Sequence, residues 1–255
     1  MTGEIAQAMH HEQPFLTARW RDLVMITWAM DPGVLRPLLP AGTELDLWEG
    51  DALASVVAFD FADTRVRGVS VPFHRRFPEV NLRFYVRRPM PDGSVRRGVA
   101  FVQEMVPRPT IAWVARTLYG EPYVSRRMRQ VAVPPDPQPD LGGVPRSLVY
   151  EWERDGEWER VIALVTSSYQ LPRAGSLEDF VVNQQWGYTR RSSSRTHEYR
   201  VEHPPWKLAL DAECLFEADI SSIFGKRFAL PLERAPLSTF VADGSAVAVF
   251  RGRTL

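Results

Sequence analysis

The chain has 255 residues, of which 45% are hydrophobic and 24% charged, a composition typical of a globular protein that buries an apolar core. Its 31 basic and 31 acidic residues cancel, which argues against nucleic acid or an anionic membrane as a partner, because no net field attracts either. The single cysteine, Cys214, excludes an intrachain disulfide and any metal site built from several cysteines.

The start of the sequence lacks the pattern of a secretion signal, since no basic segment is followed by an apolar one. No apolar run approaches the roughly 18 residues that a membrane helix needs. The single cysteine also fits a reducing compartment. We therefore expect a soluble, cytoplasmic protein without a membrane partner.

The first part of the chain is predicted to be rich in β-strands. A polar arm over residues 1–13 is followed by β-branched and aromatic residues that predict a strand over 15–30. Residues 31–42 predict one short helical turn. Residues 45–66 predict a hairpin that turns at Glu49–Asp51.

Residues 78–88 predict a strand with one apolar and one polar face, because side chains alternate across a strand. The polar face holds Glu79, Asn81, Arg83, Tyr85 and Arg87. A turn at 91–94 leads into a partner strand over 95–106. The residues alone leave open whether the polar face meets bulk water or lines an enclosed cavity.

The second part of the chain continues in the same style. A short helix is predicted over 109–120, and the proline- and glycine-rich residues 134–145 form a linker or a long excursion. A hairpin over 146–169 turns at Asp155–Gly156. A helix begins at the capping residue Ser176, and most of the remaining chain is extended.

Four stretches resemble the uncharacterised YqjF-like family, namely residues 15–61, 71–88, 98–123 and 203–206. That family is grouped with the acetoacetate-decarboxylase-like superfamily, whose members form a mostly antiparallel β-barrel or cone around a small central pocket. The resemblance implies an α+β, β-dominated fold with a few short peripheral helices and a single domain over residues 14–255. It also implies that the polar face of the strand 79–87 points inward, but it brings no known reaction.

One segment departs from the true acetoacetate decarboxylases. They carry a Gly-x-Pro-Lys segment whose lysine forms an imine with the substrate ketone, whereas the similar segment here is Gly120-Glu121-Pro122-Tyr123. A phenol or a guanidinium cannot replace the amine in that chemistry. The chain has only two lysines, so imine catalysis would need Lys207 to reach the pocket from another strand, and the simpler interpretation of Lys207 is a residue facing solvent.

Arg83 is the first candidate for ligand binding. An enclosed arginine needs a carboxylate or a bound anion to offset its burial, and its planar fork matches a substrate carboxylate. Glu79 and Asn81 are its expected partners on the same face, and Tyr85 would add a hydroxyl. A solvated strand face remains the alternative for Arg83, and surface ladder pairing remains the alternative for Glu79 and Arg87.

The second group of candidates lies near the end of the partner strand. Glu104 is a candidate general acid or base if enclosure raises its pKa, and an ion pair with an arginine is the alternative. Arg116, Tyr119, Glu121 and Tyr123 surround the segment that carries the lysine in the decarboxylases. We expect a polar pocket mouth with altered chemistry there, while packing and capping roles stay open.

No metal or cofactor motif stands out. The five histidines lack the spacing of a zinc site, and His203, before two prolines, is interpreted as a hydrogen-bonded structural residue. Phosphate loops, nucleophile elbows and dinucleotide fingerprints are absent from the sequence. We expect no cofactor.

Two functions follow from these observations. The first is an enzyme that takes a small, anionic organic acid or keto acid without imine catalysis, with Arg83 and Arg116 polarising the substrate and Glu104 or Glu79 transferring protons. The second is a non-catalytic binding or sensor module that uses the same cavity for a neutral or amphipathic ligand. A homo-oligomer joined through exposed aromatics such as Trp186 and Trp206 is a weaker alternative.

Overall fold

The structure is a computed structural model, and it describes residues 13–70, 76–110, 120–133, 146–210 and 212–255. Three of the segments predicted from sequence fall wholly or mostly outside these residues. They are the N-terminal arm 1–13, the helix over 109–120 and the excursion 134–145.

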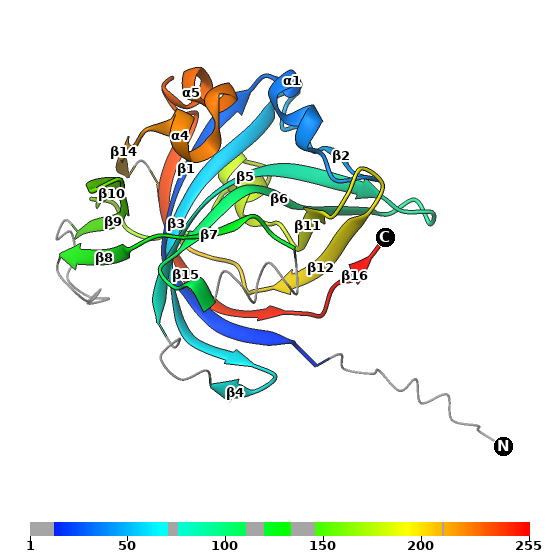
Figure 1. The fold of residues 1–255 in the computed structure, drawn as a ribbon, viewed down its shortest axis with the longest axis horizontal. Helices are drawn as coiled ribbons and strands as arrows, with labels where there is room; N and C mark the ends of the chain where they lie inside the picture. The colour runs from blue at the N-terminus through cyan, green and yellow to red at the C-terminus, as the bar shows by residue number, and fades with distance from the viewer. Residues whose placement is uncertain (1–12, 71–75, 111–119, 134–145, 211) are drawn as a thin grey trace.

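Most of the described chain forms a closed ring of strands (Figure 1). The ring follows the order β15-β1-β3-β5-β6-β11-β12 and closes because β12 also pairs with β15. Its strands are β1 (Leu16–Met30), β3 (Ala52–Val66), β5 (Phe77–Pro89), β6 (Val95–Val106), β11 (Trp186–Arg190), β12 (Thr196–Glu202) and β15 (Ser238–Val249). Shorter strands attach to it, namely β2 (Glu44–Leu45), β4 (Val69–Ser70), β7 (Tyr123–Ser125), β13 (Leu208–Leu210) and β16 (Arg253–Thr254).

Four further strands form a separate sheet in the order β14-β10-β9-β8. They are β8 (Met128–Val133), β9 (Arg146–Arg154), β10 (Glu157–Val165) and β14 (Glu213–Glu217). The predicted hairpin is confirmed, since β9 and β10 pair around Asp155 and Gly156, which both have positive φ. Pairing is antiparallel throughout this sheet, and in the ring only β6 with β7 and β6 with β11 pair in parallel among the described strands.

The described helices are short and lie at the periphery, as expected. They are α1 (Pro32–Leu35), a 3-10 turn η1 (Arg36–Leu38), α3 (Leu177–Val182), α4 (Ile220–Phe224) and α5 (Lys226–Leu232). The predicted cap of α3 is confirmed, because the Ser176 hydroxyl accepts a hydrogen bond from the Asp179 backbone amide at 3.2 Å. The β-dominated α+β fold with few peripheral helices is therefore confirmed. Among the described residues no helix is long and apolar enough to cross a membrane.

The predicted hairpin over residues 45–66 is wrong in its pairing. The tight turn exists, with reciprocal backbone hydrogen bonds of 3.0 and 2.9 Å between Trp48 and Asp51. However, β2 pairs with β5 and not with β3. Both edges of β3 are already occupied by β1 and β5, so no edge is left for β2.

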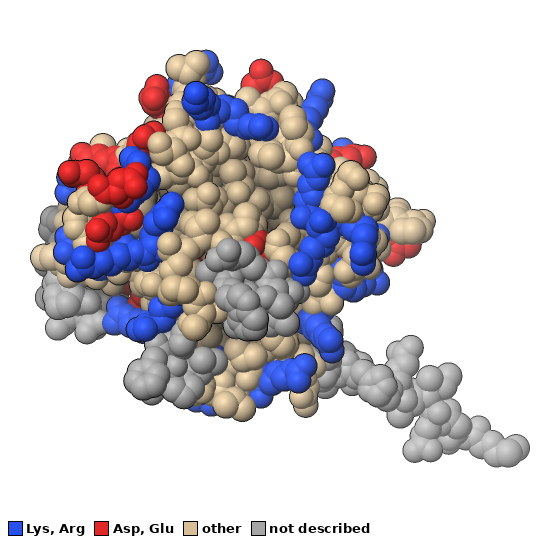
Figure 2. Space-filling model, in the orientation of Figure 1, with Lys and Arg blue, Asp and Glu red and all other residues tan. Residues whose placement is uncertain are grey.

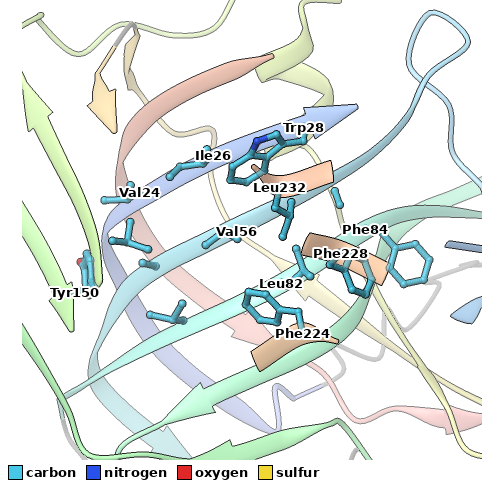
Figure 3. Close-up of a cluster of buried hydrophobic side chains, with 14 of the residues drawn as sticks. Val24, Ile26, Trp28, Val56, Leu82, Phe84, Tyr150, Phe224, Phe228 and Leu232 are labelled. Atoms are coloured by element: carbon cyan, nitrogen blue, oxygen red, sulfur yellow. The ribbon is translucent and has the colours of Figure 1, made fainter. Parts of the chain in front are cut away.

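The strand β5 is buried on both faces. Its apolar side chains at positions 80, 82, 84 and 86 are fully buried in a core shared with the four-stranded sheet and with α4 and α5. Figure 3 shows Leu82 and Phe84 in this core beside Phe224, Phe228 and Leu232. The opposite, polar face of β5 consequently looks toward the inside of the ring.

A β-bulge in β1 redirects side chains toward the ring interior. The register of β1 with β3 shifts between Arg21 and Val24, and Asp22 has φ 56°. Arg146 of the second sheet donates hydrogen bonds of 2.7 and 3.1 Å to the Asp22 carboxylate. The bulge reverses the alternation, so that Trp20 and Leu23 face the same cavity.

Charges of both signs occur on the face of the molecule that Figure 2 shows. Figure 2 shows acidic and basic side chains on the same face, with a broad uncharged area between them. This distribution agrees with the formal net charge of zero.

Candidate functional site

The ring encloses a cavity of about 440 Å³, a volume within the range of small-molecule sites, about 300–1,000 Å³. Side chains from β1, β3, β5, β6, β7, β11, β12 and β15 line it. Its lining is mainly apolar, and the polar groups come chiefly from β5, β6 and β7.

Neighbouring strands place the polar groups side by side. Asn81 of β5 pairs in register with Glu104 of β6, and Glu104 pairs with Tyr123 of β7. Glu79 and Arg83 lie two residues on either side of Asn81, on the same face of β5. Glu79, Asn81 and Glu104 are each at most 2% exposed, and Arg83 is 9% exposed. The part of the polar face of β5 from Glu79 to Arg83 is therefore buried and lines the cavity.

Hydrogen bonds organise the carboxyl groups of this site. Asn81 Nδ2 donates to Glu79 Oε1 at 2.9 Å, and the Tyr123 hydroxyl donates to Glu79 Oε2 at 3.0 Å. The Tyr199 hydroxyl of β12 donates to Glu121 Oε1. Two tyrosines thus hold two buried glutamates from different sides of the ring.

A glycine makes room for the second of these tyrosines. Gly187 of β11 pairs with Tyr199 in register, and a Cβ atom at residue 187 would lie 2.1 Å from Tyr199 Cζ. Only a residue without a side chain lets the phenol ring cross β11 in this way. The tyrosine can therefore reach Glu121.

The three glutamates hold protons unusually strongly. Burial raises the pKa of Glu79 to about 7, although hydrogen bonds from Asn81 and Tyr123 act in the opposite direction. Burial likewise raises the pKa of Glu121 to about 8. The pKa of Glu104 lies well above its usual range because of burial and then repulsion from Glu121 and Glu79. Around neutral pH the cavity therefore contains neutral carboxylic acids that can donate hydrogen bonds.

Arg83 is the arginine that lines this cavity among the described residues. Its Nη2 donates to the backbone carbonyl of Val181 at 3.3 Å, and its Nε is buried without a hydrogen-bond partner among the described groups. It forms no ion pair with a described carboxylate, and Glu79, its expected partner, is bound instead by Asn81 and Tyr123.

Buried polar atoms without a partner among the described protein groups concentrate around this cavity. They include Trp20 Nε1, Thr64 Oγ1, Asn81 Oδ1, Arg83 Nε, Glu104 Oε2 and Gln184 Oε1. Buried polar groups in native proteins are normally hydrogen-bonded to protein, water or a ligand. The cluster therefore indicates a site that receives polar atoms from outside the chain.

The structure brings together some of the residues singled out from sequence and separates others. Glu79, Asn81, Arg83, Glu104, Glu121 and Tyr123 line the cavity. Tyr85 is 1% exposed but is not among the lining residues, and its hydroxyl shares a hydrogen bond of 2.6 Å with Ser55. Arg116 and Tyr119 lie outside the described residues.

Both lysines of the chain lie away from this cavity. Lys207 and Lys226 are exposed, and neither lines it. Tyr123 of the Gly120-Glu121-Pro122-Tyr123 segment does line it. The expectation that Trp206 is exposed is wrong: it is 2% exposed, because it packs inside the ring and donates to Ser245 Oγ at 2.8 Å.

Several lining residues escaped the sequence analysis, among them Trp20, Gln184, Tyr199, His203 and Trp206. His203 stacks on Trp206 with ring centroids 4.0 Å apart, which supports a structural role. The alternation in β12 places Tyr199 and Val201 on one face, but no local pattern indicates that this face meets Glu121. Among the described residues no group of three metal-ligating side chains is found.

Comparison with solved structures identifies the class of fold. An acetoacetate decarboxylase-like enzyme from Sphingomonas wittichii RW1 is 15% identical with a TM-score of 0.63, over 95% of this chain and 94% of that one. The enduracididine biosynthesis enzyme MppR complexed with pyruvate is 17% identical with a TM-score of 0.62, over 98% and 93%. Acetoacetate decarboxylase from Legionella pneumophila is 11% identical with a TM-score of 0.60, over 96% and 88%. The chain thus has the acetoacetate-decarboxylase-like fold.

The family follows from the sequence match. The model of the DUF2071 family of uncharacterized conserved proteins matches residues 17–246, so the chain belongs to that family. The uncharacterized protein YqjF of Bacillus subtilis (strain 168) is 41% identical over 68 residues, which are 26% of this chain. The match spans only 28% of that relative's length. The resemblance stated from sequence is confirmed.

Proposed function

We propose that the chain binds a small organic acid or oxo acid inside the ring, with the ligand carboxylate paired to Arg83. The observation that carries this proposal is a buried guanidinium with an unpartnered Nε and no ion pair to a described carboxylate. A buried cation without a counter-charge costs several kcal/mol. A ligand carboxylate would offset this cost and satisfy the fork of donors.

The neighbouring acids supply the second half of the recognition. Burial and the repulsion from Glu121 and Glu79 raise the pKa of Glu104 and favour its protonated form, which can donate a hydrogen bond to a ligand carbonyl oxygen; its Oε2 has no partner among the described groups. Glu79, with a pKa of about 7, can take or give a proton near neutral pH. These groups support proton transfer at the carbon next to the carbonyl, with Glu79 and Glu104 as candidate catalytic residues and Asn81, Glu121 and Tyr123 as binding residues.

The reaction, if one occurs, does not proceed through an imine in this proposal. Both lysines are exposed away from the cavity, and a phenol at residue 123 cannot form an imine. One structural neighbour, MppR, was solved in complex with pyruvate, an oxo acid of the proposed class. That neighbour supports the class of ligand for this fold.

The second candidate function is a binding or sensor module without turnover. The mainly apolar lining and the missing amine favour it. The two functions share the acid site and differ only in whether the bound acid is changed. Mass spectrometry of oxo acids incubated with purified protein separates the two functions. A reaction product that forms with the wild type and does not form with Glu104→Gln excludes the pure binder.

The acid site itself is tested by a thermal-shift screen and calorimetry with small carboxylic and oxo acids. We expect at least one acid to stabilise the wild type, and Arg83→Ala to weaken its binding about 10-fold or more, as for the loss of a hydrogen bond to a charged group. The matched control is Arg87→Ala, on the same strand but exposed and paired with Glu44, which should bind normally. Equal responses of Arg83→Ala and the wild type would contradict the proposal.

A further inference from the structure

We infer that the natural ligand is amphipathic: an organic acid or oxo acid carrying a bulky apolar group, either an aryl group or an alkyl chain of similar size. The inference depends on the proposed function for the position of the acid group. It goes beyond that function because it assigns the rest of the cavity to the rest of the ligand.

The cavity has an aromatic wall, which we define as Trp20, Phe59, Phe61, Phe77 and Trp206. The rings form one continuous cluster. Trp20 lies 5.2 Å from Phe59 and 6.0 Å from Trp206, and Phe61 stacks on Phe77 at 4.7 Å between ring centroids. These side chains therefore present a continuous apolar surface to the cavity.

Strand register fixes where this surface lies relative to the acid site. Phe59 of β3 pairs with Glu79 of β5, and Phe61 pairs with Phe77. Moving along β5 from Arg83 through Asn81 and Glu79 to Phe77 therefore leads from the cation to the aromatic wall. A ligand held by Arg83 would extend its other end along this line.

The wall is held in place by contacts of its own. Trp206 donates its indole N–H to Ser245 Oγ at 2.8 Å, and His203 stacks on it with an interplanar angle of 13°. Ring pairs of this kind contribute about 0.5–1.5 kcal/mol each beyond area burial. A preformed apolar surface loses little entropy on binding, so it favours a ligand that covers it.

The volume of the cavity also favours a ligand with a bulky apolar group. A cavity of about 440 Å³ falls in the range that holds drug-sized ligands, about 300–1,000 Å³, and a three-carbon acid fills only a small part of it. Pyruvate bound at Arg83 would leave the aromatic wall uncovered. An added apolar group would bury that wall against the ligand, which is favourable in proportion to the area removed from water.

The test is isothermal titration calorimetry with straight-chain 2-oxo acids from pyruvate to 2-oxooctanoate, together with phenylpyruvate. We expect the dissociation constant to fall about fourfold per added methylene group, the factor that corresponds to burial of one CH₂. Trp20→Ala should reduce this gain in affinity per methylene group, because it removes part of the aromatic wall. Trp158→Ala is the matched control, since Trp158 lies on β10, packs beside Arg129 and does not line the cavity.

The outcomes separate this inference from the proposed function. Affinities that depend on Arg83 but do not rise with chain length would overturn the amphipathic ligand and leave the acid site standing. Absence of binding by every acid would remove the acid site and the inference with it. The chain-length series uses the wild-type protein, so it decides the question even if Trp20→Ala does not fold.

Discussion

The hydroxyl of Tyr123 lies 3.0 Å from Glu79 Oε2 and donates a hydrogen bond to it. Tyr123 stands where the motif resemblance implies a lysine, and it meets the first carboxyl group on the polar face of β5. The hydroxyl stabilises the ionised form of this carboxyl group. The contact therefore acts against burial, which raises the pKa of Glu79.

Removal of this hydroxyl should raise the pKa of Glu79. In Tyr123→Phe the hydrogen bond that favours the ionised carboxylate is lost, so the pKa should move above its present value of about 7. Carbon-detected NMR titration of the glutamate side chains measures the change. Tyr85→Phe serves as control because Tyr85 bonds to Ser55 outside the cavity lining, and an identical Glu79 titration in wild type and Tyr123→Phe would contradict the assignment.

Acid binding should weaken as pH rises. Glu79 and Glu121, with pKa values of about 7 and about 8, are largely neutral below pH 7 and become anions above it. Each new anion repels a bound carboxylate, so the affinity for the acid should be highest below pH 7 and should fall across pH 7 to 8. The fall should be up to about tenfold per pH unit for each proton that is taken up with the ligand. Calorimetry between pH 6 and 9 measures this, and Glu121→Gln should remove the upper part of the fall. An affinity independent of pH in that range would show that these carboxyls do not face the ligand.

The free energy of unfolding should also fall with rising pH because of these groups. Their folded pKa values are raised above the ordinary 4.5, so the folded state keeps protons that the unfolded state releases. The stabilisation is fully present below about pH 4.5 and is lost as pH rises to about 7 for Glu79 and about 8 for Glu121, at about 1.4 kcal/mol per unit of pKa difference.

Urea unfolding of the wild type and of the double variant Glu79→Gln/Glu121→Gln measures this dependence on pH. The difference in unfolding free energy between the two proteins should grow between pH 5 and 8 in favour of the variant. Glu44→Gln, at an exposed residue, is the control and should track the wild type. Parallel curves for all three proteins would be inconsistent with the raised pKa values.

Incubation with an oxo acid and a borohydride should leave both lysines unmodified. Imine trapping needs an amine beside the bound ketone, and Lys207 and Lys226 are exposed away from the cavity. Peptide mapping by mass spectrometry checks both positions. A reduced adduct at Lys207 that forms at low acid concentration and is lost in Arg83→Ala would restore the imine mechanism.

The salt bridge that anchors the β1 bulge should be important for stability. Asp22 and Arg146 are 5% and 7% exposed, and removal of Arg146 leaves a buried carboxylate without its partner. Arg146→Ala should lower the free energy of unfolding by about 3–5 kcal/mol. The exposed pair of Arg160 and Glu217 provides the control, because Arg160→Ala should cost less than about 1 kcal/mol; equal effects would mean that the bulge is held by other contacts.

Alternation along β5 predicted correctly that one of its faces is apolar and the other polar. Composition and turn residues likewise predicted the β5–β6 hairpin, the β9–β10 hairpin and the capped helix α3. These features depend on neighbouring residues, so local sequence contains the information. The pairing of β2 was mispredicted because it depends on which strand edges are free, and the rest of the sheet decides that.

Some residues of the candidate site could likewise be predicted from the sequence, and others could not. The motif segment at Glu121 and Tyr123 and the polar residues of β5 could be chosen from sequence by resemblance and by periodicity. Tyr199, Gln184 and the aromatic wall could not, because strands and turns from separate parts of the chain bring these side chains to one cavity. Contacts of this kind follow from the order of strands in the sheet, and no short-range pattern encodes that order.

By itself the sequence determined the strand-rich class of the fold, the small number of amines and the segregation of polar from apolar side chains on β5. Only the tertiary structure decided that the polar face is enclosed, because the pairing of β12 with β15 closes the ring around it. That closure removes water from three carboxyl groups, and desolvation disfavours their charged forms. Their raised pKa values are therefore a property of the closed ring and not of any segment of the chain.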